Sequence, residues 1–426
     1  MKTLDYWDGR LTTIPSSIDC AEMRILGGDH APPVFTGPGH IDIRSTTDID
    51  FTMYATPADD SDAIRRLARA RENPYEVLDQ FVLVATDYQG TEWNCGWIRP
   101  ELKGMPNIGW PLTGKINSLV TRAEGPWVSE QSSVELVFRP KLCLPMDKAM
   151  VTVTSIDGTE IERKHSAGQQ TIQLLNSEVR FFYTPSSDSL WLTAETSDKL
   201  QHPYAENWVS EPLRILLGQL VYPRLVARNF GDGTAHVWLR PLPRHFRSLS
   251  IASLLGEDPS GARKEFWELY ASLLRLIAEA RDDDGHPNLE SHPITRFYEE
   301  IIRATQGSKW VLCMTLSSVA EGLLRLLIPP GQKVKIDNFM KMLVRQNILV
   351  DENQLSWTKV RHAVMHGQLV SLWGTKEEDK ELDHLVDLVR RLTREFIKQR
   401  VDVKSDTTRV SIESPPHTPG MAVTDE

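Results

Sequence analysis

Residues 357–367 read W-T-K-V-R-H-A-V-M-H-G, and their spacing predicts an α-helix that ends at Gly367. Glycine commonly follows the last turn of a helix because it adopts left-handed backbone angles at little cost. At 100° per residue the apolar residues share one arc of the helix: Trp357, Val360, Ala363 and Val364. His362 and His366 fall on the opposite side with Lys359, and Arg361 lies at the border. The helix is therefore expected to turn its apolar arc toward a core and its two imidazoles away from it.

Helical periodicity extends on both sides of this stretch and predicts a helical C-terminal half. Apolar residues recur with the spacing of one helix face in several segments: residues 262–280, 294–304, 310–327, 339–346, 357–365 and 382–400. The segment 310–327 is strongly apolar and holds one acidic residue, Glu321. Glu321 is expected either to reach the Arg361 helix and hold a histidine or Arg361, or to mark the edge of a helix face.

The N-terminal half has the pattern of β-strands. Residues 48–53 alternate polar and apolar side chains, which is typical of a half-buried strand. Similar runs are separated by turn residues: 81–86, 134–139, 150–156, 171–175, 179–183 and 190–194. Residues 225–230 and 234–239 flank a Gly-Asp-Gly turn and predict a hairpin, whereas 60–72 and 211–222 predict helices. This half is therefore expected to be a sandwich or barrel-like β domain.

These patterns predict an α+β protein with a domain boundary near the Pro-rich stretch 240–244. A β-rich recognition or regulatory domain is expected over residues 1–245 and a helical connector over 246–294. An all-α domain is expected over 295–402, and a polar, disordered tail over 403–426. The chain lacks 18 consecutive apolar residues and an apolar signal core, and its four cysteines are scattered. These features predict a cytoplasmic protein without a membrane span.

Charge limits the possible partners. The formal net charge of −10 excludes a constitutive nucleic-acid coat, which is usually basic. The charge is nevertheless uneven, since residues 299–400 contain 16 Lys and Arg but 13 Asp and Glu. This segment either meets a polyanion locally or shows ordinary variation along the chain.

Two groups of side chains contain residue types that can bind a metal. His362 and His366 have a helical spacing that can chelate a metal, but no Glu follows His362 as a zinc-protease HExxH motif requires. Asp282, Asp283 and Asp284 are consecutive and lack the spaced ligands of an EF-hand, which favours a solvated loop. No metal and no cofactor are therefore expected.

The tryptophans of the β-rich half allow two interpretations. Trp93, Trp97, Trp110 and Trp127 lie close together in the sequence. They line a groove for a sugar, base or peptide, or they pack the core and shield strand edges. The chain contains neither a P-loop nor a G-x-S-x-G elbow, so neither ATP hydrolysis nor an esterase is indicated.

The run from Arg361 to His366 resembles the R-x(4)-H motif of HEPN domains, which are small all-α domains. His362 fits the polar residue that usually follows the arginine in that family, and the order of helices over residues 295–400 resembles its bundle. The whole arrangement is also similar to bacterial antiphage-defence proteins of the ApeA type. These have a β-rich N-terminal region before an Apea-like HEPN domain. In the N-terminal half the resemblance rests on position, length and a Gly-rich opening over residues 27–39.

The resemblance implies metal-independent RNA cleavage in an abortive response to phage. The 2′-OH of the RNA would attack the adjacent phosphate, with His366 as acid and base and Arg361 as phosphate clamp. His362 would orient these groups or transfer a second proton. The family also implies a homodimer whose two motifs face each other, and a phage-derived trigger. The alternative is a non-catalytic HEPN module for dimerisation or nucleotide binding in a sensor protein.

Overall fold

The computed structural model describes most of the chain in two compact units. The described residues are 3–28, 31–73, 76, 80–104, 109–146, 150–154, 160–165, 168–183, 188–243, 250–256, 263–282, 284–287, 291–329, 331–365 and 376–402. The first unit comprises residues 1–142, 180–196 and 222–244, and the second comprises 143–179, 197–221 and 245–426. The chain thus passes between the units several times, whereas the sequence predicted contiguous segments over residues 1–245, 246–294, 295–402 and 403–426.

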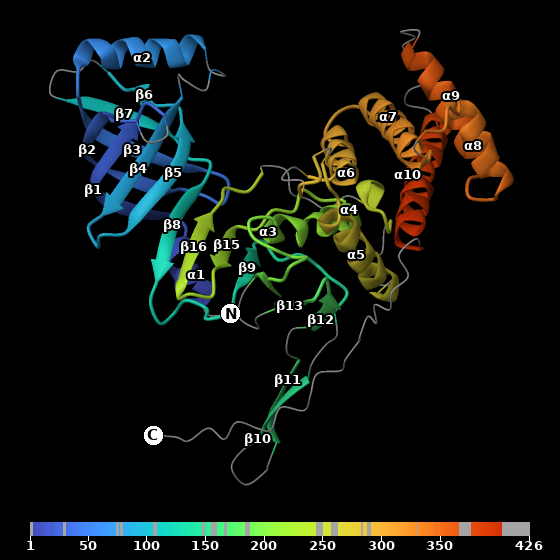
Figure 1. Ribbon diagram of the computed structural model, residues 1–426, viewed down its shortest axis with the longest axis horizontal. Coiled ribbons are helices and arrows are strands. Elements are labelled where there is room, and N and C mark those ends of the chain that lie inside the picture. The colour runs from blue at the N-terminus through green and yellow to red at the C-terminus, as the bar shows by residue number, and fades with distance from the viewer. Residues whose placement is uncertain are drawn as a thin grey trace. The chain divides into compact units, whose positions relative to one another are not determined.

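The α+β prediction is confirmed, since strands dominate the N-terminal part and helices the C-terminal part (Figure 1). Fourteen strands form one sheet, in the order β12-β13-β14-β9-β15-β16-β8-β5-β4-β1-β2-β3-β7-β6. Their bounds are β1 (Ser16–Leu26), β2 (Pro33–Ile43), β3 (Ile49–Pro57), β4 (Phe81–Asp87), β5 (Glu92–Ile98), β6 (Glu101–Leu102), β7 (Trp110–Lys115), β8 (Leu119–Glu124), β9 (Ser133–Phe138), β12 (Gln169–Leu174), β13 (Ser177–Tyr183), β14 (Leu190–Glu195), β15 (Leu225–Asn229) and β16 (Thr234–Leu239). The hairpin of β10 (Met150–Thr154) and β11 (Glu160–His165) is separate from this sheet.

The predicted hairpin after residue 224 is confirmed. β15 pairs antiparallel with β16, and Leu225 lies opposite Leu239. Gly231 and Gly233 in the turn have φ angles of 80° and 83°. Glycine adopts this left-handed region without the steric cost that a Cβ brings, so the Gly-Asp-Gly sequence suits the turn.

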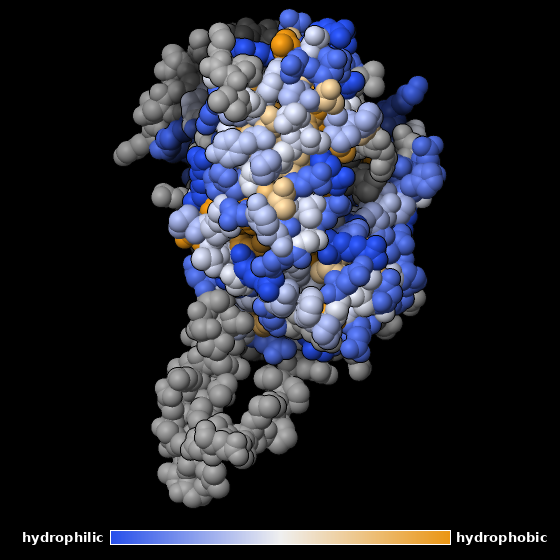
Figure 2. Space-filling model, turned by 90° about the vertical axis from the view of Figure 1, so that its left-hand side faces the viewer, coloured by the Kyte–Doolittle hydropathy of each residue, from blue (hydrophilic) through white to orange (hydrophobic). Residues whose placement is uncertain are grey.

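The sheet of the first unit encloses an apolar core. In β3 the alternate residues Ile49, Phe51, Met53 and Ala55 are buried, as the period-2 pattern predicts. The helices α1 (Thr3–Leu11) and α2 (Asp60–Glu72) also belong to this unit. Figure 2 shows one side of the molecule, where the surface is mostly hydrophilic and apolar residues are scattered.

The second unit is built mainly of helices, with α7 at its centre. The helices are α3 (Ala205–Trp208), α4 (Glu211–Leu217), the short 3₁₀ helix η2 (Ser250–Ala252), α5 (Arg263–Ala278), α6 (Pro293–Ala304), α7 (Lys309–Leu327), α8 (Ile336–Arg345), α9 (Asp351–Met365) and α10 (Lys376–Asp402). α7 contacts α6, α8, α9 and α10. By length and composition α7 is apolar enough to span a membrane, but half of its most apolar window is buried against protein. A core helix of a soluble bundle has the same properties.

Several helices differ from their predicted bounds: α8 begins three residues earlier than predicted, α10 begins six residues earlier, and α4 and α9 also differ. α4 ends at Leu217, before the predicted end at residue 222, because Gly218 takes left-handed angles that end the helix. α9 begins at Asp351, six residues earlier than predicted. Acidic residues in the first turn, Asp351 and Glu352, favour the helix start through the helix dipole.

A buried polar network joins α4 to α6 within the second unit. Arg214 Nη1 lies 2.6 Å from Glu299 Oε1, and Thr295 Oγ1 donates a hydrogen bond of 2.7 Å to Glu211. Burial raises the pKa of Glu211, against the opposing effects of the Thr295 hydrogen bond and Arg214. This network explains why residues 197–221 belong with the helices, although the sequence placed them in the β-rich domain.

Candidate functional site

Arg361 lies where three helices of the second unit meet. Its Nε is 3.4 Å from Glu321 Oε2 on α7, and its Nη1 is 3.4 Å from Asp337 Oδ1 on α8. Its guanidinium also lies over the ring of Trp357, with Cζ 4.9 Å from a ring centroid. The side chain keeps 32% of its surface exposed. The guanidinium is therefore held in a defined position at the surface of the bundle.

Trp357 positions Arg361 from one helical turn away. It is almost fully buried, and its indole Nε1 donates a hydrogen bond of 3.2 Å to the carbonyl of Ser317 on α7. This bond and the packing of the indole fix α9 against α7, because a buried indole N–H needs a partner. Residues four apart lie on the same side of a helix, so Arg361 emerges beside this anchor.

Glu321 contacts Arg361 on α9. Of the two interpretations of Glu321 from the sequence, this is the one in which it reaches the helix of the motif. Its other oxygen, Oε1, accepts a hydrogen bond of 2.7 Å from Arg325 Nη2 on α7 itself. The carboxylate thus lies between two guanidinium groups and is partly buried. Glu321 is the only acidic residue in the sequence of α7, so its contact with Arg361 depends on the packing of two helices.

The described part of α9 follows the predicted division between a buried and an exposed side. Trp357, Val360 and Ala363 are buried, and His362 is exposed. His366 and Gly367 lie outside the described residues, so the expected proximity of His366 to Arg361 stays a prediction. The structure brings together Arg361 and Glu321, and it places His362 one residue beyond Arg361 on the exposed side.

A second polar cluster on α9 was not predicted from the sequence. Lys359 Nζ lies 2.7 Å from Glu381 Oε1, and Ser356 Oγ lies 2.9 Å from His384 Nδ1. Asn353 Nδ2 donates a hydrogen bond of 2.8 Å to the carbonyl of His384. These contacts connect α9 to α10 on another side from Arg361. The i, i+3 spacing of Ser356 and Lys359, matched by Glu381 and His384, was the available signal.

Glu381 is ionised more readily than an ordinary glutamate. Partial burial raises the pKa of its carboxyl, but hydrogen bonds from Lys359 and Ser356 lower it by more, so the net pKa is lowered. The negative charge of Glu381 therefore persists at neutral pH and holds Lys359 beside α10. This cluster fixes α9 against α10, and α10 in turn packs on α7.

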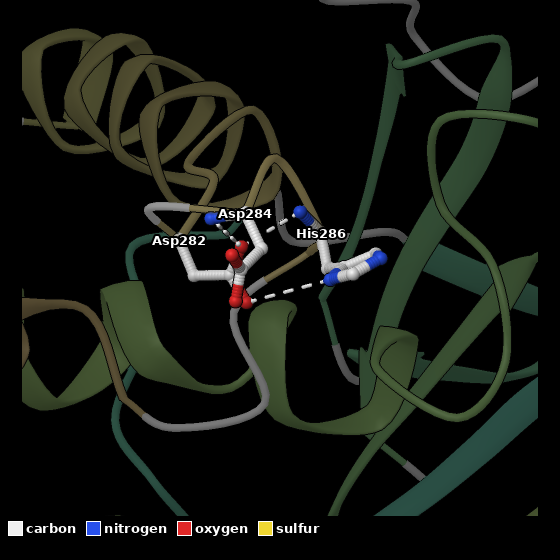
Figure 3. Close-up of side chains that lie close together, drawn as sticks. All are labelled: Asp282, Asp284 and His286. Carbon is white, nitrogen blue, oxygen red and sulfur yellow. Dashed lines mark hydrogen bonds and ion pairs between the residues drawn. The ribbon is translucent and has the colours of Figure 1, made fainter.

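Asp282, Asp284 and His286 form a cluster of possible metal ligands after α5 (Figure 3). All three are exposed. Asp282 Oδ1 accepts hydrogen bonds from the backbone N–H groups of Asp284, at 3.0 Å, and His286, at 2.7 Å. The carboxylate thus already serves to close the turn, which agrees with a solvated loop. Asp283 lies outside the described residues.

The four tryptophans of the β-rich half serve different purposes. Trp93 and Trp110 are buried in the core, as the packing interpretation required. Trp127 is partly exposed and stacks on Tyr6, with ring centroids 4.6 Å apart. Trp97 is 40% exposed and lines a cavity of the first unit.

No family model matches the chain, and no curated protein matches it. Arguments about function therefore rest on the residues and their chemistry.

Proposed function

We propose that the protein is a HEPN-type, metal-independent endoribonuclease of antiphage, abortive-infection defence, with Arg361 and His366 as its catalytic pair. The observation that supports this best is the position of Arg361. Its guanidinium is fixed between α7, α8 and α9, yet about a third of the side chain faces solvent. An active site needs a cation that is both oriented and accessible. The succession α6 to α10, with α7 central, also suits a HEPN-like bundle.

Arg361 would bind the phosphate that is cleaved. A guanidinium stays protonated and presents a planar fork of donors that matches two phosphate oxygens. In the structure these donors face the carboxylates of Glu321 and Asp337. A phosphate would compete for the same donors, and Asp337 is the more exposed of the two acids. Glu321 would keep the guanidinium in place, whereas Asp337 would yield to RNA.

His366 would move the proton. The 2′-OH loses its proton as it attacks phosphorus, the bond from phosphorus to O5′ breaks, and O5′ gains a proton. The products are a 2′,3′-cyclic phosphate and a 5′-OH. The nucleophile comes from the RNA, so this mechanism requires no metal ion. An ordinary imidazole titrates near pH 6.5 and can both accept and donate a proton near neutral pH.

Two copies of the chain would complete the site. In-line displacement needs one group to take the proton from the 2′-OH and another to donate one to O5′. We therefore place two R-x(4)-H motifs across a homodimer cleft formed by the helical bundles. His362, exposed beside Arg361, would orient these groups or serve as the second proton carrier. The β-rich part would respond to a phage-derived trigger in the cytoplasm.

One observation favours the alternative, a non-catalytic HEPN module for dimerisation or nucleotide binding. Arg361 pairs with two carboxylates and an indole, as an arginine in a purely structural network does. In that case its substitution would change stability or assembly, and RNA would not be cleaved.

The deciding experiment is RNA cleavage by the purified full-length protein in EDTA, with 3′ and 5′ product ends determined. The test variant is His366→Ala. The control is His286→Ala, which removes an exposed histidine from the turn after α5. Loss of cleavage in the first variant alone supports the proposed site. Wild-type protein that never cleaves RNA, with or without phage lysate, contradicts the enzyme and favours the alternative.

A further inference from the structure

The first unit contains a cavity that is separate from the proposed ribonuclease site. Its volume is about 620 Å³, and its walls come from the start of β3, the end of β5, the segment around β6 and the end of β7. Small-molecule sites commonly have volumes of about 300–1,000 Å³. The cavity is therefore large enough for a metabolite of several rings and charged groups.

Gly114 shapes one wall of this cavity. A Cβ on Gly114 would lie 2.8 Å from the carbonyl oxygen of Arg99 and 2.6 Å from the ring of Phe51. Neither distance is compatible with a side chain, so only glycine lets the chain after β5 approach β7 this closely. This close approach brings the segment after β5 next to the end of β7, and residues of both line the cavity.

The base of the cavity is apolar, and one wall is aromatic. Phe51 and Ile98 are buried and contribute apolar surface. Trp97 lines the same cavity with 40% of its surface exposed. This exposure is notable because burial of an indole ring is energetically favourable. An exposed indole in a cavity wall offers a flat surface on which a planar ring can stack.

The rim of the cavity is cationic. Four basic residues line it, Arg44, Arg99, Lys103 and Lys115, against two acidic ones, Asp50 and Glu101. Arg44 pairs with Asp50, and Lys115 pairs with Asp48 just outside the lining, each at 3.3 Å. Arg99 and Lys103 are exposed beside Trp97. An anionic group on a ligand would therefore meet Arg99 and Lys103 beside the aromatic wall, with Arg44 and Lys115 engaged with carboxylates nearby.

A neighbouring cavity of the same unit lacks these properties. It has a similar volume, about 610 Å³, but its charged lining consists of Arg66 and Arg69 with Asp62, Glu72 and Glu76. Its aromatic lining residue, Phe81, is buried. The combination of exposed indole and excess positive charge thus distinguishes the cavity at Trp97.

We propose that the cavity at Trp97 binds a mononucleotide, with the base stacked on Trp97 and the phosphates held by Arg99 and Lys103. A planar base requires the indole, phosphate requires the cations, and the amides of Gln80 and Asn117 can hydrogen-bond a base edge or ribose. A neutral sugar would not need the cations that line the cavity. An acidic peptide would bind these cations but has no planar ring to stack on Trp97. This site gives the β-rich unit a small-molecule ligand and does not involve Arg361.

The proposal is tested by isothermal titration of the full-length protein with AMP, GMP, CMP, UMP and the corresponding triphosphates. The comparison probes are adenosine, inorganic phosphate and a 15-residue oligo(U). Trp97→Leu should weaken binding about tenfold or more, because stacking of a base on an aromatic ring is worth about 1–3 kcal/mol. Trp127→Leu, which removes another exposed tryptophan, should leave binding unchanged.

A second pair of variants tests the phosphate contacts. Lys103→Gln should weaken binding of the nucleotide but not of its nucleoside, whereas Lys199→Gln, an exposed lysine elsewhere, should alter neither. Arg361→Ala should retain nucleotide binding even if RNA cleavage is lost, so the two sites fail independently. Absence of binding for every nucleotide at 1 mM, binding of oligo(U) alone, or equal loss in Trp97→Leu and Trp127→Leu would each overturn the proposal.

Discussion

Glu321 Oε2 lies 3.4 Å from Arg361 Nε, so the lone carboxylate of α7 pairs with the arginine of the R-x(4)-H motif on α9. The surroundings of Arg361 are therefore formed by α7 as well as by α9. The pair also makes the orientation of Arg361 depend on the packing of the bundle.

Glu321→Gln should reduce RNA cleavage about tenfold, because Arg361 loses the charge that orients its guanidinium. The free energy of unfolding should change by about 1 kcal/mol or less, since partly exposed ion pairs contribute little. Cleavage rate and urea unfolding measure the two effects. Glu300→Gln, which breaks an exposed pair with Arg303 on α6, is the matched control and should leave the rate unchanged. A rate unchanged in Glu321→Gln would remove Glu321 from the site.

His366→Ala should abolish RNA cleavage and growth inhibition, because general acid–base catalysis commonly contributes about 10²–10⁴-fold. Arg361→Lys should also impair cleavage, since an ammonium group lacks the planar fork. EDTA should leave the wild-type rate unchanged. Cleavage rates with and without EDTA, beside melting temperatures, test these points. A chelator-sensitive rate would instead indicate a metal at His362 and His366, and full activity of His366→Ala would refute the site.

The helical bundle should form a homodimer in which the two motifs share a cleft. Sedimentation velocity at micromolar protein, with and without a non-cleavable RNA, measures the association. A mixture of His366→Ala and Arg361→Lys chains should recover part of the activity if groups from both copies act at one cleft. Monomer under all conditions would contradict this arrangement.

Stability should fall as the pH drops from about 6.5 toward 4 because of His292. Burial and, secondarily, the charge of Arg400 lower the pKa of this imidazole to about 4, so the folded protein keeps it neutral. Its Nδ1 accepts the backbone N–H of Ile294 at the start of α6. The unfolded chain takes up a proton near pH 6.5, and stability is therefore complete above that pH and lost as the pH falls toward 4. The loss should reach at most about 3 kcal/mol.

Urea unfolding at several pH values measures this effect. His292→Asn keeps a side chain that can cap α6 but cannot be protonated, so it should flatten the pH dependence. His286→Asn removes an exposed histidine and should keep the wild-type slope. The same slope in His292→Asn would show that other groups cause it.

Breaking the buried pair of Arg214 and Glu299 should strongly destabilise the second unit. The two side chains keep only 5% and 11% of their surfaces exposed. Removing one partner leaves a buried charge uncompensated, which typically costs about 3–5 kcal/mol. Urea unfolding should show this loss for Glu299→Leu. The double variant Glu299→Leu with Arg214→Leu should be more stable than Glu299→Leu alone, because no buried charge is left without a partner. A double variant no more stable than Glu299→Leu would contradict this explanation.

Local sequence predicted most elements because their causes are local. Asp59 and Ser308 cap α2 and α7 by accepting hydrogen bonds from the backbone N–H groups three residues later, and both helices lie within a residue of their predicted bounds. The apolar arc of α9 was visible for the same reason. Pairs such as Ser356 with His384 depend on how two helices face each other, which periodicity does not encode. The contact of Glu321 with Arg361 was one of two alternatives until the packing of α7 and α9 decided it.

The repeated passage of the chain between its units limits how the gene can be divided. A fragment beginning at residue 246 would contain Glu299 and Thr295 but lack their partners on α4, Arg214 and Glu211. A recombination event at that point would therefore transfer a helical bundle with an unpaired buried acid. The helical bundle can therefore be exchanged intact only together with residues 197–221, which carry α4.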